Sequence, residues 1–232
     1  MKSPASFNPV RSRRTVQDQV YDQLREALVS GAFEAGQSFT ISALSTQFET
    51  SHMPVREALR RLAAENALRI SSTGTAVVPD LSAEELGQIC QARLIIEPAT
   101  AEIAFDRIGA DERRTLAEIL DTHRHTGETG DITAMLEANR HFHFCIYHAA
   151  GNLVLISQIE NLWLRSGAYV RFLSDRMGDL LKTSYKAGFT RYHDDMLAAF
   201  DAGDRAGFRA AMTADIVATR DLLMDFLNED SA

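Results

Sequence analysis

Histidines and an aspartate recur on apolar helical faces in the second half of the chain. His143 follows Asn139 by four residues, so the two share one face of a predicted helix with apolar neighbours. His193 and Asp215 lie on two later apolar faces of the same kind. Histidine and carboxylate groups that meet inside a helical bundle suit a divalent first-row metal. A hydrogen-bonded core histidine is the commoner alternative for any one of them.

The remaining histidines fall elsewhere. His141 and His148 are seven residues apart on a different face of the helix that carries His143, so the two sets cannot serve one metal. We prefer the His143 face because it is the more strongly apolar. His123 and His125 fall in a polar stretch, and we expect both to be exposed to solvent.

Arg93 and Glu97 form a second candidate group. They are i, i+4 neighbours on an otherwise apolar helix, so one face carries both charges. One interpretation is a surface ion pair. The other is that Arg93 faces the interior of a bundle and binds the carboxylate of a ligand as a bidentate donor. Spacing alone leaves both open.

A third group indicates nucleic-acid chemistry near the N-terminus. Ser51, His52 and Met53 lie at the start of a predicted helix that runs to about residue 66, and Arg56 and Arg60 lie on its outer face. Arginine can bind guanine O6 and N7 in a bidentate manner, and a helix N-terminus favours phosphate through its free N–H groups. The alternative is a solvated helix face, or a trihelical unit that binds another protein.

The elements around this group describe a winged helix-turn-helix domain over residues 15–79. Apolar spacing predicts helices at 16–30, 41–48 and 52–66, and short β-like runs at 68–71 and 75–78 predict a hairpin. The third helix of such a unit enters the major groove. The hairpin tip, Thr73, Gly74 and Thr75, would approach the minor groove. Residues 1–14, with three arginines, read as a flexible basic arm.

Residues 80–232 are predicted to be helical throughout. The whole is therefore a mainly α fold, with an N-terminal winged helix-turn-helix followed by an all-α antiparallel helical bundle. We expect the second part to bind an effector and to dimerise. Its helices are predicted near 82–107, 110–125, 131–150, 152–174, 175–187, 189–202 and 204–227.

Charge is divided unevenly between these two parts. The chain of 232 residues has a net charge of −8, but residues 1–80 are close to neutral at +1 and residues 81–232 carry −9. A basic surface at the N-terminus is therefore compatible with the acidic total. No apolar run reaches the roughly 18 residues of a membrane span. Cys90 and Cys145 cannot form a disulfide framework. We expect a cytoplasmic protein with no membrane partner.

The N-terminal residues carry a family resemblance. The stretch VYDQLREAL at 20–28, glycines at 31 and 36, and MPVREALRRL at 53–62 resemble the DNA-binding domain of GntR-type transcription regulators. The resemblance implies a double-stranded DNA operator as partner. Three features depart from the family pattern: Ser42 stands where an arginine is common, Asn66 stands where a glycine is usual, and the wing lacks a basic residue beside Gly74.

Residues 83–227 resemble the FCD ligand-binding domain of the FadR-like subfamily. The matching stretches are 93–99, 142–152 and 193–212. The resemblance implies a divalent metal such as zinc, nickel or manganese, a small carboxylate effector beside it, and a homodimer. Carried over by position, the metal ligands are Asn139, His143, His193 and Asp215, and Arg93 is the carboxylate clamp. Asn139 and Asp215 replace the family's usual aspartate and histidine.

Together these features predict a ligand-responsive transcription regulator, a repressor that senses a small organic acid, and not an enzyme. One alternative is a helical-bundle metalloenzyme that uses His143, His193 and Asp215 as ligands, although no nucleophile motif accompanies them. Another is an interaction module whose DNA head has degenerated, which Ser42 and the weakly basic wing would favour.

Overall fold

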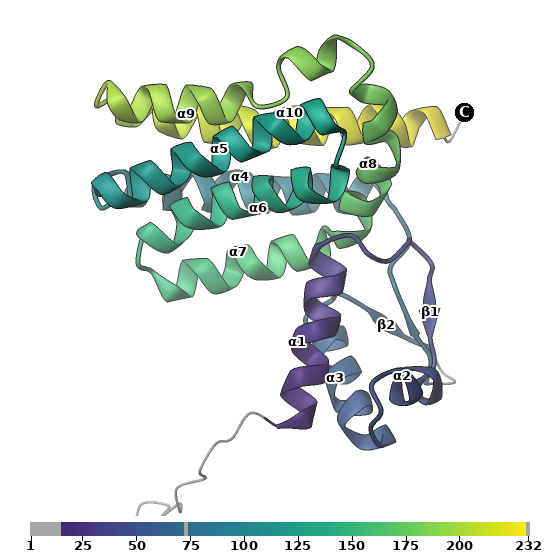
Figure 1. Cartoon of the computed structure of the whole chain (residues 1–232). Helices are drawn as coiled ribbons and strands as arrows, with labels where there is room; N and C mark the ends of the chain where they lie inside the picture. Colours follow the sequence, from purple (N-terminus) through teal and green to yellow (C-terminus); the bar gives the residue numbers. More distant parts are fainter. Residues whose placement is uncertain (1–14, 72–73, 231–232) are drawn as a thin grey trace, which may run out of the picture.

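The computed structural model describes residues 15–71 and 74–230, so the predicted basic arm lies outside the described residues. The mainly α fold is confirmed (Figure 1). Three helices and a small sheet form an N-terminal head, residues 15–80. Helices α4 to α10 form a bundle, and α1 of the head stands nearly across the bundle axis with one end against it.

The head is built on α1 (Val16–Val29), α2 (Ile41–Gln47) and α3 (His52–Ala64). Thr15 begins α1 with a capping box to Asp18, which satisfies N–H groups that a helix start otherwise leaves unpaired. Apolar side chains at helical spacing on α1 and α3 then pack together as the core of the head. They include Val20, Leu24, Leu28, Val55, Leu59 and Leu62.

Asn66 explains how α3 ends without the glycine that the family pattern has there. Its φ is 59°, in the left-handed region that glycine usually occupies after a helix. Asparagine adopts this conformation more readily than other residues with a Cβ, so the chain turns at the same place.

The wing is a three-stranded antiparallel sheet with the order β1-β3-β2. The predicted hairpin is present as β2 (Arg69–Ile70) and β3 (Ala76–Val77). A third strand, β1 (Ser38–Phe39), pairs with β3 and was not predicted, because two residues are too few for an alternating pattern.

The bundle consists of seven α-helices and one short 3-10 helix among the described residues. In it, α10 packs against α4 and α9, and α5 packs against α6. The bounds are α4 Ala83–Phe105, α5 Ala110–Thr129, α6 Ile132–Ala149, α7 Leu153–Arg165, α8 Gly167–Leu180, η1 Ser184–Ala187, α9 Arg191–Asp201 and α10 Arg205–Asp230.

Three predicted helices differ from the structure, and one of them, expected at 110–125, continues to Thr129 as α5. The helix expected at 152–174 is interrupted at Ser166, whose hydroxyl donates to the carbonyl of Leu162 over 2.9 Å. The helix expected at 175–187 belongs partly to α8 and partly to η1. The interruption lies where Leu164 and Ala168 leave the bundle and join the apolar core of the head. The boundary between α7 and α8 therefore coincides with contact to the head, and the spacing of apolar residues along this segment does not predict it.

Head and bundle are in close backbone contact. A Cβ on Gly167 would lie 2.0 Å from the carbonyl oxygen of Leu28, and a Cβ on Gly31 would lie 2.8 Å from the backbone nitrogen of Arg171. Gly31 also has a φ of +72°, which residues with a Cβ rarely adopt. These two glycines allow the end of α1 to rest directly on the start of α8.

Candidate functional site

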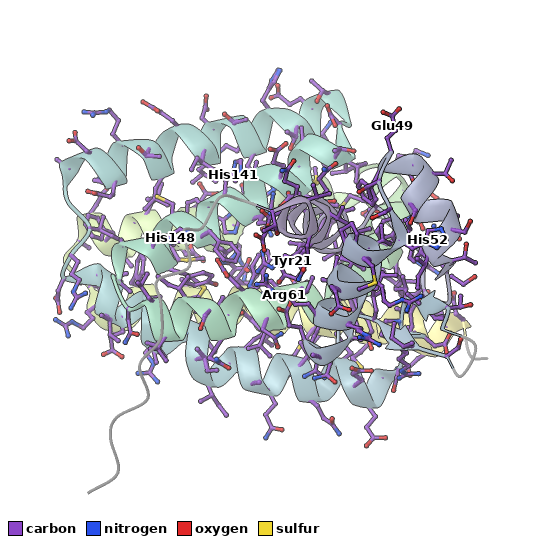
Figure 2. All side chains as sticks on the ribbon, turned by 90° about the horizontal axis from the view of Figure 1, so that it is seen from below. Tyr21, Glu49, His52, Arg61, His141 and His148 are labelled. Atoms are coloured by element: carbon purple, nitrogen blue, oxygen red, sulfur yellow. The ribbon has the colours of Figure 1, made fainter. Side chains whose placement is uncertain are left out.

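The start of α3 presents its polar side chains to solvent. Ser51, His52 and Arg56 are exposed, and Met53 is 59% exposed, although it is a large apolar residue. Ser51 is the N-cap residue but makes no side-chain capping bond. Among the described residues, Arg56 forms no ion pair. This end of the helix can therefore meet a DNA groove without first breaking contacts inside the head (Figure 2 labels His52 on the head, in the view from below).

The later arginines of α3 are exposed but already engaged. Arg60 pairs with Glu57 on the same helix at 3.1 Å. Arg61 lies over the ring of Tyr21, 3.6 Å from its centroid, and pairs with Glu65 at 3.3 Å. Tyr21 and Arg61 thus face one another between α1 and α3 (Figure 2). Arg61 fixes the packing of the two helices, whereas Arg60 retains an accessible guanidinium.

The wing tip is described only in part. Gly74 is exposed, has a φ of +82°, and would meet no atom within 4 Å if it carried a Cβ. Thr75 is half-buried, and its backbone N–H donates to the Ser71 hydroxyl over 3.1 Å. Thr73 lies outside the described residues. Gly74 gives the tip its turn and leaves room for a close approach to a backbone.

Inside the bundle, three of the predicted ligands converge from α6, α9 and α10. The Nε2 atoms of His143 and His193 lie 3.2 Å apart. One carboxylate oxygen of Asp215 lies 3.2 Å from His143 Nε2, and the other lies 3.7 Å from His193 Nε2. Both histidines are buried, while the Asp215 side chain is 16% exposed. The cluster is therefore closed on the histidine side and reachable past the carboxylate.

The residues present fit a divalent metal. Ligand atoms around a tetrahedral ion with bonds of about 2.0–2.2 Å are separated by roughly 3.3–3.6 Å. The three separations measured here, two of which run to different oxygens of Asp215, are 3.2, 3.2 and 3.7 Å, close to that range. Two imidazole nitrogens and one carboxylate oxygen also match the ligand types that zinc and its first-row neighbours prefer. Three protein ligands leave a position for water or for an effector oxygen.

His123 was predicted to be exposed in a polar loop, and this prediction was wrong. The residue lies within α5, is 3% exposed, and its Nδ1 is 3.3 Å from Nδ1 of His193. A hydrogen bond there needs one proton between the two nitrogens, which leaves His193 Nε2 directed at the cluster. The i, i+3, i+4 spacing from Leu116 and Leu120 to His123 could have revealed the buried face.

Asn139 lies one turn before His143 on α6, and its place among the metal ligands stays a prediction. Among the described residues, no hydrogen bond joins Asn139 to His143, His193 or Asp215. Its side chain lines a cavity beside α1, where Glu26 and Val29 form part of the wall. The four-residue spacing places Asn139 on the same general face of α6 as His143, but one turn further toward the head.

Arg93 faces the interior, as the sharper interpretation held, and it is also ion-paired. Its Nε and Nη2 donate to the two oxygens of Glu97 over 2.7 and 3.3 Å. Glu97 is fully buried and accepts two further bonds, from the Tyr147 hydroxyl at 2.5 Å and from Trp163 Nε1 at 3.1 Å. Four donors satisfy this carboxylate, which offsets the cost of burying its charge.

Tyr147 connects this ion pair to the metal ligands. Because its hydroxyl donates to Glu97, its oxygen accepts from Nδ1–H of His143 over 3.1 Å. The His143 ring is thereby held with Nε2 toward Asp215 and His193. A continuous polar chain thus runs from Arg93 through Glu97, Tyr147 and His143 to the cluster. We call it the inner polar chain.

Burial and charge together set the pKa values in the cluster. Burial lowers the pKa of His193 to about 3, despite the nearby Asp215, and lowers that of His123 to about 4, where His143 acts in the same direction. Burial alone would raise the pKa of Asp215, but its close contact with His143 and the charge of the nearby Arg93 lower it to about 2. His193 and His123 are therefore neutral and Asp215 ionised at pH 7, as a metal site requires.

Comparison with known proteins now settles the family. Residues 16–78 match the gntR family of bacterial regulatory proteins, and residues 88–218 match the FCD domain. The chain belongs to the GntR family, in the branch that carries an FCD domain. It is 30% identical over 191 residues to the HTH-type transcriptional regulator McbR of Escherichia coli K12, covering 82% of this chain and 85% of that one.

Two further likenesses accompany this one. The solved structure of E. coli McbR/YncC superposes with a TM-score of 0.80 at 26% identity, over 92% of this chain and 99% of that chain. The gluconate operon transcriptional repressor of Bacillus licheniformis is 36% identical over 114 residues, which is 47% of this chain and 45% of the relative. This GntR-family protein is therefore a DNA-binding transcription regulator. No described helix has the length and apolarity of a bilayer span.

Proposed function

We propose that this regulator is a repressor whose operator affinity is set by a metal and a small organic acid bound in its bundle. The observation that carries the proposal is the pairing of two features in one chain. The side chains at the start of α3 are exposed, and among the described residues Arg56 forms no ion pair. The inner polar chain ends at three residues, each of which offers one ligand atom to a metal. The named function of the gluconate operon repressor supports repression as the mode of action.

Operator contact is assigned to the start of α3 and to the wing. Arg56 reads a base edge, Ser51 and His52 bind phosphate or base edges, and Met53 makes apolar contact in the groove. Arg60 lies a turn further along and contacts the DNA backbone. Thr73, Gly74 and Thr75 approach the neighbouring minor groove.

The metal is assigned to His143, His193 and Asp215, with zinc, nickel or manganese as candidates. When bound, the metal supplies an electrophilic position at which an effector carboxylate can ligate. Asn139 is kept as a candidate fourth ligand, which would offer a neutral amide oxygen. His123 takes a supporting role by orienting His193.

Arg93 is assigned to the effector through the donors that Glu97 leaves free. A guanidinium has five N–H donors, and the bonds to Glu97 use Nε and Nη2. The remaining donors can bind one further oxygen. Because Glu97 already neutralises the charge, Arg93 orients the effector more than it attracts it.

Exposed apolar side chains support a homodimer. Ile95 on α4 is 67% exposed, and Leu153 and Val154 at the start of α7 are 79% and 71% exposed. Exposed apolar side chains of this size are common in subunit contacts. A two-fold dimer would present two heads to the half-sites of a pseudo-palindromic operator.

The test uses a duplex that the full-length protein itself selects from a random library. Its affinity is measured with metal-loaded and chelator-treated protein, each with and without a panel of small carboxylates. We expect at least one acid to change the affinity of the metal-loaded protein by about 5- to 150-fold, the usual range of allosteric coupling. An affinity that neither metal nor any acid alters would contradict the proposal. The metalloenzyme alternative is not favoured by the family comparison.

A further inference from the structure

Two adjoining cavities lie where α1 of the head meets the bundle. Their volumes are about 170 and 220 Å³, and Val29, Arg140 and Trp163 line both. Together they reach the lower part of the range of about 300–1,000 Å³ that is typical of small-molecule sites. We call them the joint cavity. They are distinct from the metal cluster, none of whose three ligands lines either of them.

One end of the joint cavity is apolar. Val29 of α1, Leu136 of α6 and Val170 of α8 form its walls. Trp163 closes one side, and its ring is in edge contact with Phe144 at a centroid distance of 5.2 Å. This end suits the hydrocarbon or aromatic body of a ligand.

The other end carries basic side chains from both parts of the molecule. Arg25 comes from α1, whereas Arg140, His141 and His148 come from α6. In the view from the head side, His141 and His148 lie to the left of α1, which is seen end-on (Figure 2). The spacing of these two histidines was noted in the sequence but has no part in the metal site. Three carboxylates also line the joint cavity: Glu160 and Glu26 pair with these arginines, and Glu137 lies 3.9 Å from His141, so an anion fits here by replacing one of them.

The arginines are held by carboxylates that a ligand can replace. Arg140 Nη1 donates to Glu26 of α1 over 2.9 Å, and Arg25 donates to Glu160 of α7 over 3.3 Å. The Glu26 side chain is 54% exposed, so water can solvate it once it is displaced. Both pairs join head to bundle, so a ligand that took either arginine would also remove a contact that holds α1.

We propose that the joint cavity binds a small organic acid with an apolar ring. Its carboxylate takes the place of Glu26 at Arg140, with Arg25 adding positive potential, and its ring lies against Trp163 and Val29. This site is additional to the effector position beside Arg93, and it does not require a metal. Binding there weakens the attachment of the head to α6.

The single tryptophan of the chain makes the proposal directly measurable. Trp163 fluorescence of the full-length protein is titrated with phenylacetate, and in parallel with phenylacetamide, which has the same ring and no charge. Chelator is present throughout, so that a metal-borne site cannot contribute, and no DNA is needed. We expect a saturable change with the acid and none with the amide up to ~10 mM, which covers dissociation constants up to about 1 mM.

Two variants have opposite expected effects. Arg140→Gln removes the main donor, and the dissociation constant for phenylacetate should rise at least tenfold. Glu26→Gln removes the competing carboxylate, and the dissociation constant should fall severalfold, which a merely structural role for Glu26 would not produce. Arg113→Gln, which breaks an ion pair with Asp201 outside the cavity, serves as control and should titrate like the original protein.

Several results would overturn the proposal. No saturable response to phenylacetate, an equal response to the amide, or an unchanged affinity in Arg140→Gln would each do so. Weaker binding in Glu26→Gln would show that the carboxylate supports the site and does not compete for it. Because neither DNA nor metal enters the experiment, its failure leaves the proposed repressor function standing, and the reverse also holds.

Discussion

The start of α3 and the inner polar chain use similar residue types in opposite environments: the first exposes its arginine to solvent, and the second buries its arginine beside a carboxylate. Arg56 is exposed and forms no ion pair among the described residues, while Arg93 is tied to the fully buried Glu97. A guanidinium that binds DNA can stay fully solvated in the free protein at little cost in folding free energy. An arginine beside a buried carboxylate is part of the folded core, because either charge alone would be costly there.

The contrast extends to the histidines. His52 lies exposed at the start of a helix, whereas His143 and His193 are 1% exposed and hold their ring positions through hydrogen bonds to Tyr147 and His123. Function at the surface thus depends on which atoms are left free. Function in the bundle depends on side chains from six different helices, α4, α5, α6, α7, α9 and α10, meeting at one place.

The largest expected effect follows from removing the charge of Glu97. Glu97→Gln leaves Arg93 buried and unpaired, so we expect the free energy of unfolding to fall by about 3–5 kcal/mol. Urea denaturation measures it. Glu102→Gln on the same helix breaks the partly exposed pair with Arg209 and should cost about 0–1 kcal/mol. An equal decrease in the free energy of unfolding in the two variants would show that the buried ion pair contributes no more to stability than a surface pair.

The contact between head and bundle gives the next effect. Gly167→Ala places a methyl group against the Leu28 carbonyl and should destabilise the protein by about 1–3 kcal/mol or more. Gly178→Ala on the same helix meets nothing within 4 Å and should be neutral or stabilising by up to about 1 kcal/mol. A Gly167→Ala variant as stable as Gly178→Ala would mean that the head does not rest on α8.

Metal binding should stabilise the folded chain by a comparable amount. At a free Zn²⁺ concentration of about 100 times the dissociation constant, linkage predicts roughly 2.7 kcal/mol, seen as a rise in Tm that chelator reverses. His193→Gln should abolish the shift, and His148→Gln, which changes an exposed histidine outside the cluster, should preserve it. A zinc shift that survived His193→Gln would place the metal elsewhere.

The metal-free protein should lose stability as the pH falls below about 6.5. His193 and His123 have folded pKa values of about 3 and about 4, below the value of 6.5 for an unperturbed histidine. The unfolded chain therefore binds more protons across this interval, and stability rises with pH there. Each histidine contributes a slope of up to about 1.4 kcal/mol per pH unit. His123→Gln should flatten the measured slope by about that amount, and an unchanged slope would contradict the burial of this histidine.

The smallest effect on stability is expected at the DNA surface. Arg56→Gln should change the free energy of unfolding by no more than about 0.5 kcal/mol, because the side chain is exposed and lacks an ion pair. A large loss in thermal or urea denaturation would show that Arg56 belongs to the packing of the head, as Arg61 does.

The same contrast decides what the sequence could predict. The three head helices, the hairpin and the mainly helical second part follow from local spacing, and so do the apolar faces of His143, His193 and Asp215. The partners of Glu97 could not be predicted from local spacing, because Tyr147 and Trp163 lie 50 and 66 residues away along the chain. His123 was missed because a polar composition concealed a buried face, and the interruption at Ser166 arises from contact with the head.

The most direct test of the account is the binding of Arg56→Gln to the duplex that the unaltered protein selects from a random library. We expect its affinity for that duplex to fall by about 1–3 kcal/mol, while affinity for unrelated duplex changes little and stability is retained. Binding by the unaltered protein should also weaken steeply as salt is raised. If Arg56→Gln bound the selected duplex as tightly as the unaltered protein, α3 would not be reading DNA and the central claim would be contradicted.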